Sequence, residues 1–256
     1  MSEIENMHFL DHIQELRKRI FFSLISIVIF FIPSYYFSKE SFAFLMDPLV
    51  QNLPEGSSLI FIRPTEGFIT YLKVSIFAAF VLSVPVILYQ VWSFISPALY
   101  KNEKRVVLPF ILFGTLFFLL GASFCYFIVA PKGFSFLLGE YSTENIKAFP
   151  SIKEGLSFLI SLIIGFGIIF EYPIVIYILA RFGIVNHKWL RKQRKYALLL
   201  SAVAAALITP TTDAVSMMFM LVPLLVFYEI GIYIAMIFGK KKAEEPDIVL
   251  SDTDNN

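Results

Sequence analysis

The chain alternates long apolar runs with short polar segments. About 20 predominantly apolar residues are what an α-helix needs to cross a bilayer. Six runs contain at most one charged residue each, and they span residues 20–38, 74–100, 106–130, 155–180, 196–212 and 214–239. This pattern predicts an all-α integral membrane protein with six transmembrane helices.

The last two runs do not clearly meet the length of a spanning helix. Thr209 precedes Pro210, and a residue before proline is pushed out of the helical region, so we expect the fifth helix to end near Ile208. From Tyr196 that leaves 13 residues, about 20 Å of helix against a hydrocarbon core of about 30 Å. We therefore expect short fifth and sixth helices.

The basic residues predict the orientation. An even number of spans places both termini on the same side, and fifteen Lys and Arg lie on that side against five on the other. Basic residues gather in cytoplasmic loops, so both termini are expected in the cytoplasm. Tyr35, Tyr36 and Phe37 occupy positions where a cleaved signal peptide needs small residues. The first helix should therefore be retained.

Two sizeable loops, residues 39–67 and 131–154, are expected on the outer side with helical content. The first contains a short apolar stretch among turn-forming residues, which favours an interfacial helix capping the outer side. Pro48, Pro85 and Asp213 are predicted to mark structural or functional turns.

Composition agrees with a membrane protein. Hydrophobic residues make up 57% of the chain, which has 29 Phe and only 16% charged residues, too little polar surface to cover a soluble globule. A formal charge of +1 argues against binding to nucleic acid. The lone Cys125 excludes an intramolecular disulfide and is interpreted as a small buried apolar residue. We expect one translocating membrane domain over residues 1–239 and a disordered cytoplasmic tail over 240–256, which is acidic and poor in apolar residues.

Enzyme chemistry is not indicated. The sequence has neither a GxxxxGK[ST] phosphate loop nor an HExxH zinc motif, and its three histidines fall in cytoplasmic segments outside the predicted spans. We therefore predict no catalytic residue, no metal site and no cofactor.

Glu171 lies inside the fourth apolar run, without another charge from Gly155 to Ala180. A charge near the bilayer centre costs at least ~2.5 kcal/mol, so such a residue usually faces a bundle interior, a cavity or a partner. Three interpretations stay open. In the first, Glu171 is part of a proton relay with Glu229, Lys73 or Asp213. In the second, it makes a structural hydrogen bond to a neighbouring helix, and in the third it is a docking group. Glu229 lies closer to the cytoplasmic end, where a structural role is favoured.

Several short strings, in this order and at these spacings, resemble the TatC family, the large multispanning subunit of the twin-arginine protein translocase. They are HFLDHIQELRKRI (8–20), Asp47-Pro48-Leu49, Pro64-Thr65-Glu66-Gly67-Phe68, QVWSFISPALYKNEKR (90–105), Ala130-Pro131-Lys132, Phe170-Glu171-Tyr172-Pro173, Thr209-Pro210-Thr211-Thr212-Asp213 and Phe227-Tyr228-Glu229-Ile230-Gly231. Ala98 stands where the family usually has glycine, and Thr212 where a second proline is common.

The resemblance implies a receptor for the signal peptides of folded cargo, which carry a pair of arginines. It places the binding surface on the amino-terminal segment and the first cytoplasmic loop, with the residues Glu15, Leu16, Arg17, Phe94, Tyr100, Lys101 and Glu103. Glu15 and Glu103 match the acidic positions, and carboxylates suit the forked guanidinium group. The resemblance also implies a concave bundle in the bacterial inner membrane, with single-span TatA/TatB-type partner subunits docking at Glu171. It further implies contact with membrane lipid, a homo-oligomer within the complex, and the proton motive force as the energy source.

Two other functions stay open on the residues alone. An ion-coupled secondary transporter would use Glu171 as its coupling carboxylate and would work as a purified chain in liposomes. A structural membrane scaffold would need neither Glu103 nor Glu171 beyond stability.

Overall fold

The computed structural model describes residues 3–95, 104–139, 149–208 and 214–239. The described chain is almost entirely helical. Its elements are α1 Glu3–Tyr36, α2 Ser38–Val50, α3 Glu66–Ile95, α4 Lys104–Phe124, the π-helical turn η2 Cys125–Val129, α5 Ala130–Gly139, α6 Ile152–Arg181, α7 His187–Lys192, α8 Arg194–Ile208 and α9 Ala214–Phe238. The all-α membrane architecture predicted from the sequence is confirmed.

In the described part of the chain, five helical stretches are long and apolar enough to cross a membrane, and they overlap the first, second, third, fourth and sixth predicted runs. The fifth predicted run forms α8, which has 15 residues and ends at Ile208, as expected from Pro210. The prediction of a short sixth helix is wrong, because α9 has 25 residues. Glu229 lies within this helix, and its carboxylate pairs with Arg194 of α8.

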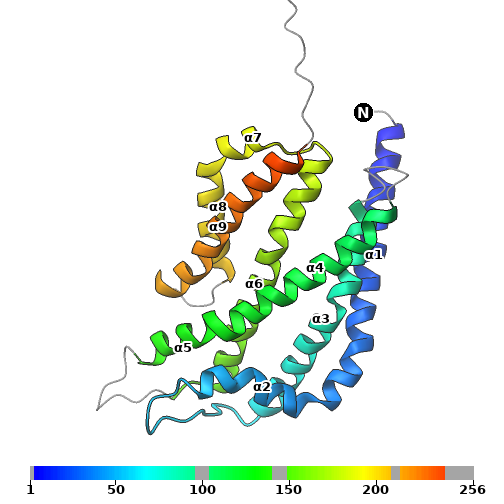
Figure 1. Ribbon diagram of the computed structural model, residues 1–256. Helices are drawn as coiled ribbons and strands as arrows, with labels where there is room; N and C mark the ends of the chain where they lie inside the picture. The colour runs from blue at the N-terminus through cyan, green and yellow to red at the C-terminus, as the bar shows by residue number, and fades with distance from the viewer. Residues whose placement is uncertain (1–2, 96–103, 140–148, 209–213, 240–256) are drawn as a thin grey trace, which may run out of the picture.

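The long helices follow one another as neighbours (Figure 1). α1 packs along α3, α3 contacts α4, α4 packs on α6, and α6 contacts α9, which packs on α8. α1 begins and α9 ends at the same end of the bundle, at the top of Figure 1; we call it the amino-terminal end. α2 lies across the opposite end. α1 and α8 thus stand at the two ends of a series of helices, and the predicted concavity stays a prediction.

The third span is longer than its apolar run because the helix passes through the predicted boundary at Pro131. A proline inside a helix lacks an N–H group and its ring clashes with the carbonyl four residues earlier. Here the π-helical turn η2 lies directly before α5, and such a turn widens the backbone at the point where the ring needs room. The predicted outer loop 131–154 is therefore helical up to Gly139.

The interfacial helix predicted in the first outer loop is present as α2, but Pro48 is not a turn. It lies inside α2, where it leaves the carbonyl of Phe44 without its usual backbone donor. The Tyr126 hydroxyl donates to that carbonyl at 2.6 Å and replaces the missing donor. Pro85 also lies inside a helix, α3, as prolines in spanning helices often do. The turn assignment is wrong for both prolines, and Asp213 lies outside the described residues.

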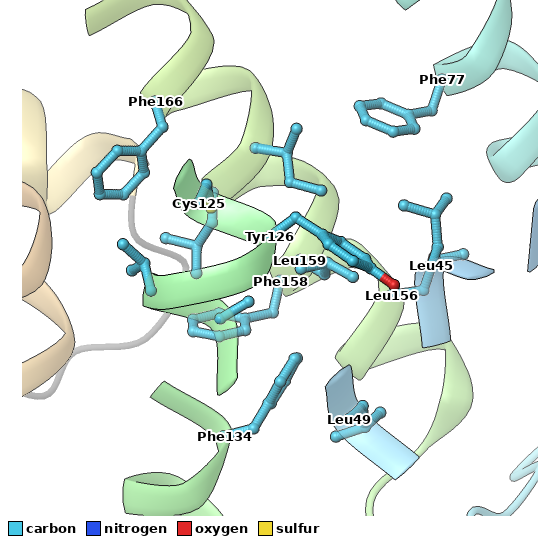
Figure 2. Packing of buried hydrophobic residues seen from close by; sticks show 14 of the residues in the cluster. Leu45, Leu49, Phe77, Cys125, Tyr126, Phe134, Leu156, Phe158, Leu159 and Phe166 are labelled. Carbon is cyan, nitrogen blue, oxygen red and sulfur yellow. The ribbon is translucent and has the colours of Figure 1, made fainter. Parts of the chain in front are cut away.

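The core gathers where α2, α3, η2, α5 and α6 meet (Figure 2). Its members include Leu45, Leu49, Phe77, Cys125, Tyr126, Phe134, Leu156, Phe158, Leu159 and Phe166. Cys125 is fully buried in it, which confirms its interpretation as a small apolar residue. This core fixes α2 and α5 against the bundle.

Glu66, at the start of α3, connects the two segments that precede α3 and α6. Its Oε2 atom accepts a hydrogen bond from the backbone N–H of Ile62 at 3.0 Å and from the Ser151 hydroxyl at 3.5 Å. Beside it, Ile60 and Ser151 form an isolated β-bridge. The side chain is only 5% exposed, so Glu66 organises the opposite end of the bundle through buried polar contacts.

Candidate functional site

α1 and α3 carry a cluster of polar and aromatic side chains at the amino-terminal end of the bundle. Glu15 and Arg19 lie four residues apart on α1, a spacing that places them on one side of a helix. Arg19 donates from Nη2 to Glu15 Oε1 at 3.1 Å and from Nη1 to Gln90 Oε1 of α3 at 3.2 Å. One guanidinium group thus joins the two helices.

An aromatic contact lies on the same side of α1. The rings of His12 and Phe94 stack with centroids 4.4 Å apart and an angle of 24° between their planes. We call the five residues His12, Glu15, Arg19, Gln90 and Phe94 the α1–α3 face. It holds the amino-terminal segment of α1 against the end of α3.

The structure brings together only part of the signal-peptide surface predicted from the sequence. Glu15 and Phe94 belong to the α1–α3 face. Leu16 and Arg17 are exposed on α1 and take no part in the contacts described for the α1–α3 face. Tyr100, Lys101 and Glu103 lie outside the described residues.

Glu171 lies on α6, half-buried, with its carboxylate against α4. A Cβ atom built on Gly114 would lie 3.2 Å from Glu171 Oε2 and 2.8 Å from Leu88 Cδ1 of α3. The absence of a side chain at Gly114 therefore provides the space that the carboxylate occupies. Glu171 Oε1 is shielded from solvent and accepts no hydrogen bond from any described residue. The expected structural hydrogen bond to a neighbouring helix is not seen in this part of the chain.

Other charged residues within the spans have partners of their own. Glu229 of α9 accepts a hydrogen bond at 2.6 Å from Arg194 of α8, a contact between helices of the kind that the predicted structural role requires. Lys73 of α3 donates to the Ser157 hydroxyl at 2.9 Å. Neither contact involves Glu171, so these pairs provide no proton relay to it, and Asp213 lies outside the described residues. Across the described residues, no group of three or more His, Cys, Asp or Glu side chains could hold a metal ion.

Sequence reasoning missed Arg19, Gln90 and Glu66 as organising residues. The four-residue spacing of Glu15 and Arg19 was a usable signal, since opposite charges at that spacing pair on a helix. Gln90 gave no such signal, because it lies 71 residues from Arg19 and meets it only through helix packing. Glu66 stands in the first turn of α3, where a carboxylate is favoured, yet its contact with Ser151 depends on the tertiary fold.

These features define a multi-pass helical membrane protein with a polar face at one end and a carboxylate without a partner among the described residues inside a span. The family profile described as Sec-independent protein translocase protein (TatC) matches residues 11–223. The chain belongs to the TatC family.

Individual relatives agree over nearly the whole length. The Sec-independent protein translocase protein TatC of Desulforapulum autotrophicum is 43% identical over 252 residues, 98% of this chain and 93% of the relative. The TatC of Aquifex aeolicus is 40% identical over 235 residues, 91% of this chain and 97% of the relative. A crystal structure of the twin-arginine translocase receptor TatC superposes with a TM-score of 0.79 at 40% identity, covering 88% of this chain and 97% of that one.

Proposed function

We propose that the chain is the signal-peptide receptor and core subunit of a Sec-independent, twin-arginine translocase that exports folded proteins across the bacterial inner membrane. In this proposal residues 1–239 form the translocase domain, both termini and the tail 240–256 face the cytoplasm, and the amino-terminal end of the bundle receives the cargo. The partners are the twin-arginine signal peptide and single-span TatA/TatB-type subunits. Membership of the TatC family favours this function over an ion-coupled transporter.

The observation that carries the proposal is the α1–α3 face in a chain of this family. It presents the half-buried carboxylate of Glu15 three residues along α1 from His12, whose ring stacks on the aromatic ring of Phe94. A guanidinium group of the cargo can take both oxygens of a carboxylate, and the apolar stretch of a signal peptide can lie against aromatic and aliphatic side chains. Leu16 adds an exposed apolar side chain on α1.

The remaining predicted residues extend this surface in the proposal. Glu103 provides the second carboxylate for the second arginine, with Tyr100 and Lys101 beside it and Arg17 on α1. Partly exposed ion pairs contribute only about 0–1 kcal/mol each, so two carboxylates cannot hold a cargo protein alone. Apolar contacts with the signal peptide must provide much of the affinity. Lysine should replace arginine poorly, because an ammonium group cannot match the guanidinium fork.

Glu171 has a separate role in the proposal. It receives a single-span partner subunit or inserted cargo within the membrane, because its Oε1 atom accepts no hydrogen bond from any described residue. Several copies of the chain assemble in the working complex, and the proton motive force drives transport.

The test is site-specific cross-linking of a synthetic peptide that carries two adjacent arginines followed by an apolar stretch. Glu103→Gln should reduce cross-linking several-fold while the protein stays folded. Glu55→Gln is the matched control, since it removes one exposed carboxylate at the opposite end of the bundle and should leave cross-linking unchanged. Equal cross-linking in the wild type and in Glu103→Gln would refute the role of Glu103.

A further inference from the structure

The carboxylate proposed to receive a cargo arginine is already occupied in the free chain. Arg19 Nη2 lies 3.1 Å from Glu15 Oε1, and the two side chains are 26% and 29% exposed. We propose that Arg19 is a resident competitor that occupies Glu15 in the place of a cargo arginine and that must release it when the signal peptide binds. This inference rests on the proposed function of Glu15.

The geometry of the pair shows why the resident contact can be exchanged. Arg19 reaches one oxygen of Glu15 through one nitrogen, because its Nη1 atom is directed to Gln90. The second oxygen, Oε2, accepts no hydrogen bond from the described residues. A cargo guanidinium that takes both oxygens makes the two parallel bonds that Arg19 does not make.

The guanidinium group of Arg19 also lacks one hydrogen bond. Its Nε–H is shielded from solvent and has no hydrogen-bond acceptor among the described residues. A buried donor without an acceptor weakens the arrangement that contains it. The free chain therefore holds Glu15 firmly enough to cover the carboxylate, but less firmly than a forked pair would.

Gln90 provides a position to which the released arginine can withdraw. It is 8% exposed on α3 and accepts from Arg19 Nη1 at 3.2 Å, a bond that does not involve Glu15. When cargo takes Glu15, Arg19 keeps this bond and stays at the boundary of α1 and α3. The displaced guanidinium group of Arg19 thus keeps a hydrogen-bond acceptor, Gln90, within the α1–α3 face.

The consequence is a lower apparent affinity for every peptide that needs Glu15. When a binding site is open for only a fraction of the time, the apparent affinity of its ligand is multiplied by that fraction. The reduction is the same for twin-arginine and twin-lysine peptides, so Arg19 sets the threshold for binding and leaves the preference for arginine unchanged.

The test is a double-mutant cycle on the full chain in detergent, read by the binding of a labelled synthetic twin-arginine peptide. Glu15→Gln should weaken binding. Arg19→Gln should strengthen it by about two- to five-fold, the range that a partly exposed ion pair allows. In the Glu15→Gln background, Arg19→Gln should change nothing further. Arg19→Met, which keeps the apolar stem, provides a second variant if Arg19→Gln folds poorly.

Lys18→Gln is the control for net charge, because Lys18 is an exposed neighbour on the same helix. If Lys18→Gln strengthens binding as much as Arg19→Gln does, the effect is general electrostatics and the inference is overturned. Weaker or unchanged binding by Arg19→Gln, with Glu15→Gln still defective, overturns the inference alone and leaves Glu15 as the acceptor. Wild-type binding by Glu15→Gln removes Glu15 from the proposed function and the competitor role with it.

Discussion

Four carboxylates within or at the ends of the spans differ in what surrounds them. Glu15 and Glu229 each pair with an arginine of the chain. Glu66 accepts from a backbone N–H and a hydroxyl. Of these four, Glu171 alone has a buried oxygen that accepts no hydrogen bond from the described residues. Groups of the chain itself donate hydrogen bonds to three of these carboxylates. A charged residue inside a span is unfavourable, so the presence of Glu171 requires a role outside the folded subunit.

Replacement of Glu171 tests this difference. Glu171→Leu should change the free energy of unfolding by less than about 1 kcal/mol, because no hydrogen bond with the described residues is lost. Glu66→Leu should lose about 1–3 kcal/mol, because it leaves the N–H of Ile62 without its acceptor. Denaturation in detergent measures both. Glu171→Leu should nevertheless reduce export of a cargo protein, and an equal loss of stability in the two variants would assign Glu171 to the fold.

Single residues could be predicted from the sequence only where local rules apply. The apolar surroundings of Glu171 and Cys125 and the reach of Glu229 to polar groups follow from position along a helix. The contacts of Gln90 with Arg19 and of Glu66 with Ser151 join residues 71 and 85 positions apart. Such contacts depend on the packing of whole helices, which apolar runs do not specify.

At the scale of elements, α4 and α6 pack closely because glycines and aromatic rings interlock. Gly167 of α6 lies against the ring of Phe118 of α4, and Gly121 of α4 lies against the backbone and side chains of α6. A Cβ atom on Gly121 would lie 2.6 Å from the carbonyl oxygen of Phe166. Small residues allow helix backbones in a membrane to approach closely. Here they bring α4 and α6 close enough for the carboxylate of Glu171 to lie against Gly114.

Two glycine substitutions on α4 separate backbone contact from side-chain contact. Gly121→Ala should destabilise the protein by about 1–3 kcal/mol, because the backbone of α6 cannot move aside without shifting the helix. Gly114→Ala is the control, since its new atom meets the ends of the side chains of Leu88 and Glu171, which can rotate away. Thermal unfolding in detergent should rank the two variants in this order. Equal losses of stability in the two variants would show that α4 and α6 can move apart at Gly121 without a larger loss than at Gly114.

The elements were easier to predict than their ends. Runs without charge located the helices, because any polar side chain facing lipid is unfavourable. The extension through Pro131 was missed, since the π-helical turn that accommodates the ring has no simple sequence signal. Proline chemistry predicts a turn at Pro48, and this prediction is wrong because the Tyr126 hydroxyl, which replaces the missing donor, belongs to a residue 82 positions from Phe44.

At the scale of the whole molecule, the two ends of the bundle are built differently. The opposite end is fixed by the core around α2 and by the buried contacts of Glu66. The amino-terminal end carries the α1–α3 face, whose ion pair and ring stack are partly exposed. A receptor that binds peptides at one side of a membrane requires one end that keeps its shape and another end whose polar contacts can be exchanged for contacts with the peptide.

The length of α8 leads to a prediction about transport. Its 15 residues extend about 22 Å, roughly 8 Å less than the hydrocarbon core of a bilayer. Leu199, Leu200 and Leu207 are exposed on it, so lipid beside α8 must thin to match the helix. We propose that this thinning lowers the barrier to a folded cargo at the place where, in the proposed function, partner subunits gather.

Insertion of one apolar turn after Ala206 should therefore reduce export strongly. The insertion lies between Arg194 and Glu229 in the chain but at the far end of α8 from Arg194, so the turn of α8 that carries Arg194 and its contact with Glu229 of α9 is kept. Binding of the twin-arginine peptide should be unchanged, because the α1–α3 face lies on other helices. Ala206→Leu is the control for added apolar surface without added length. Export by the lengthened protein at the level of the wild type would exclude local thinning as part of the mechanism.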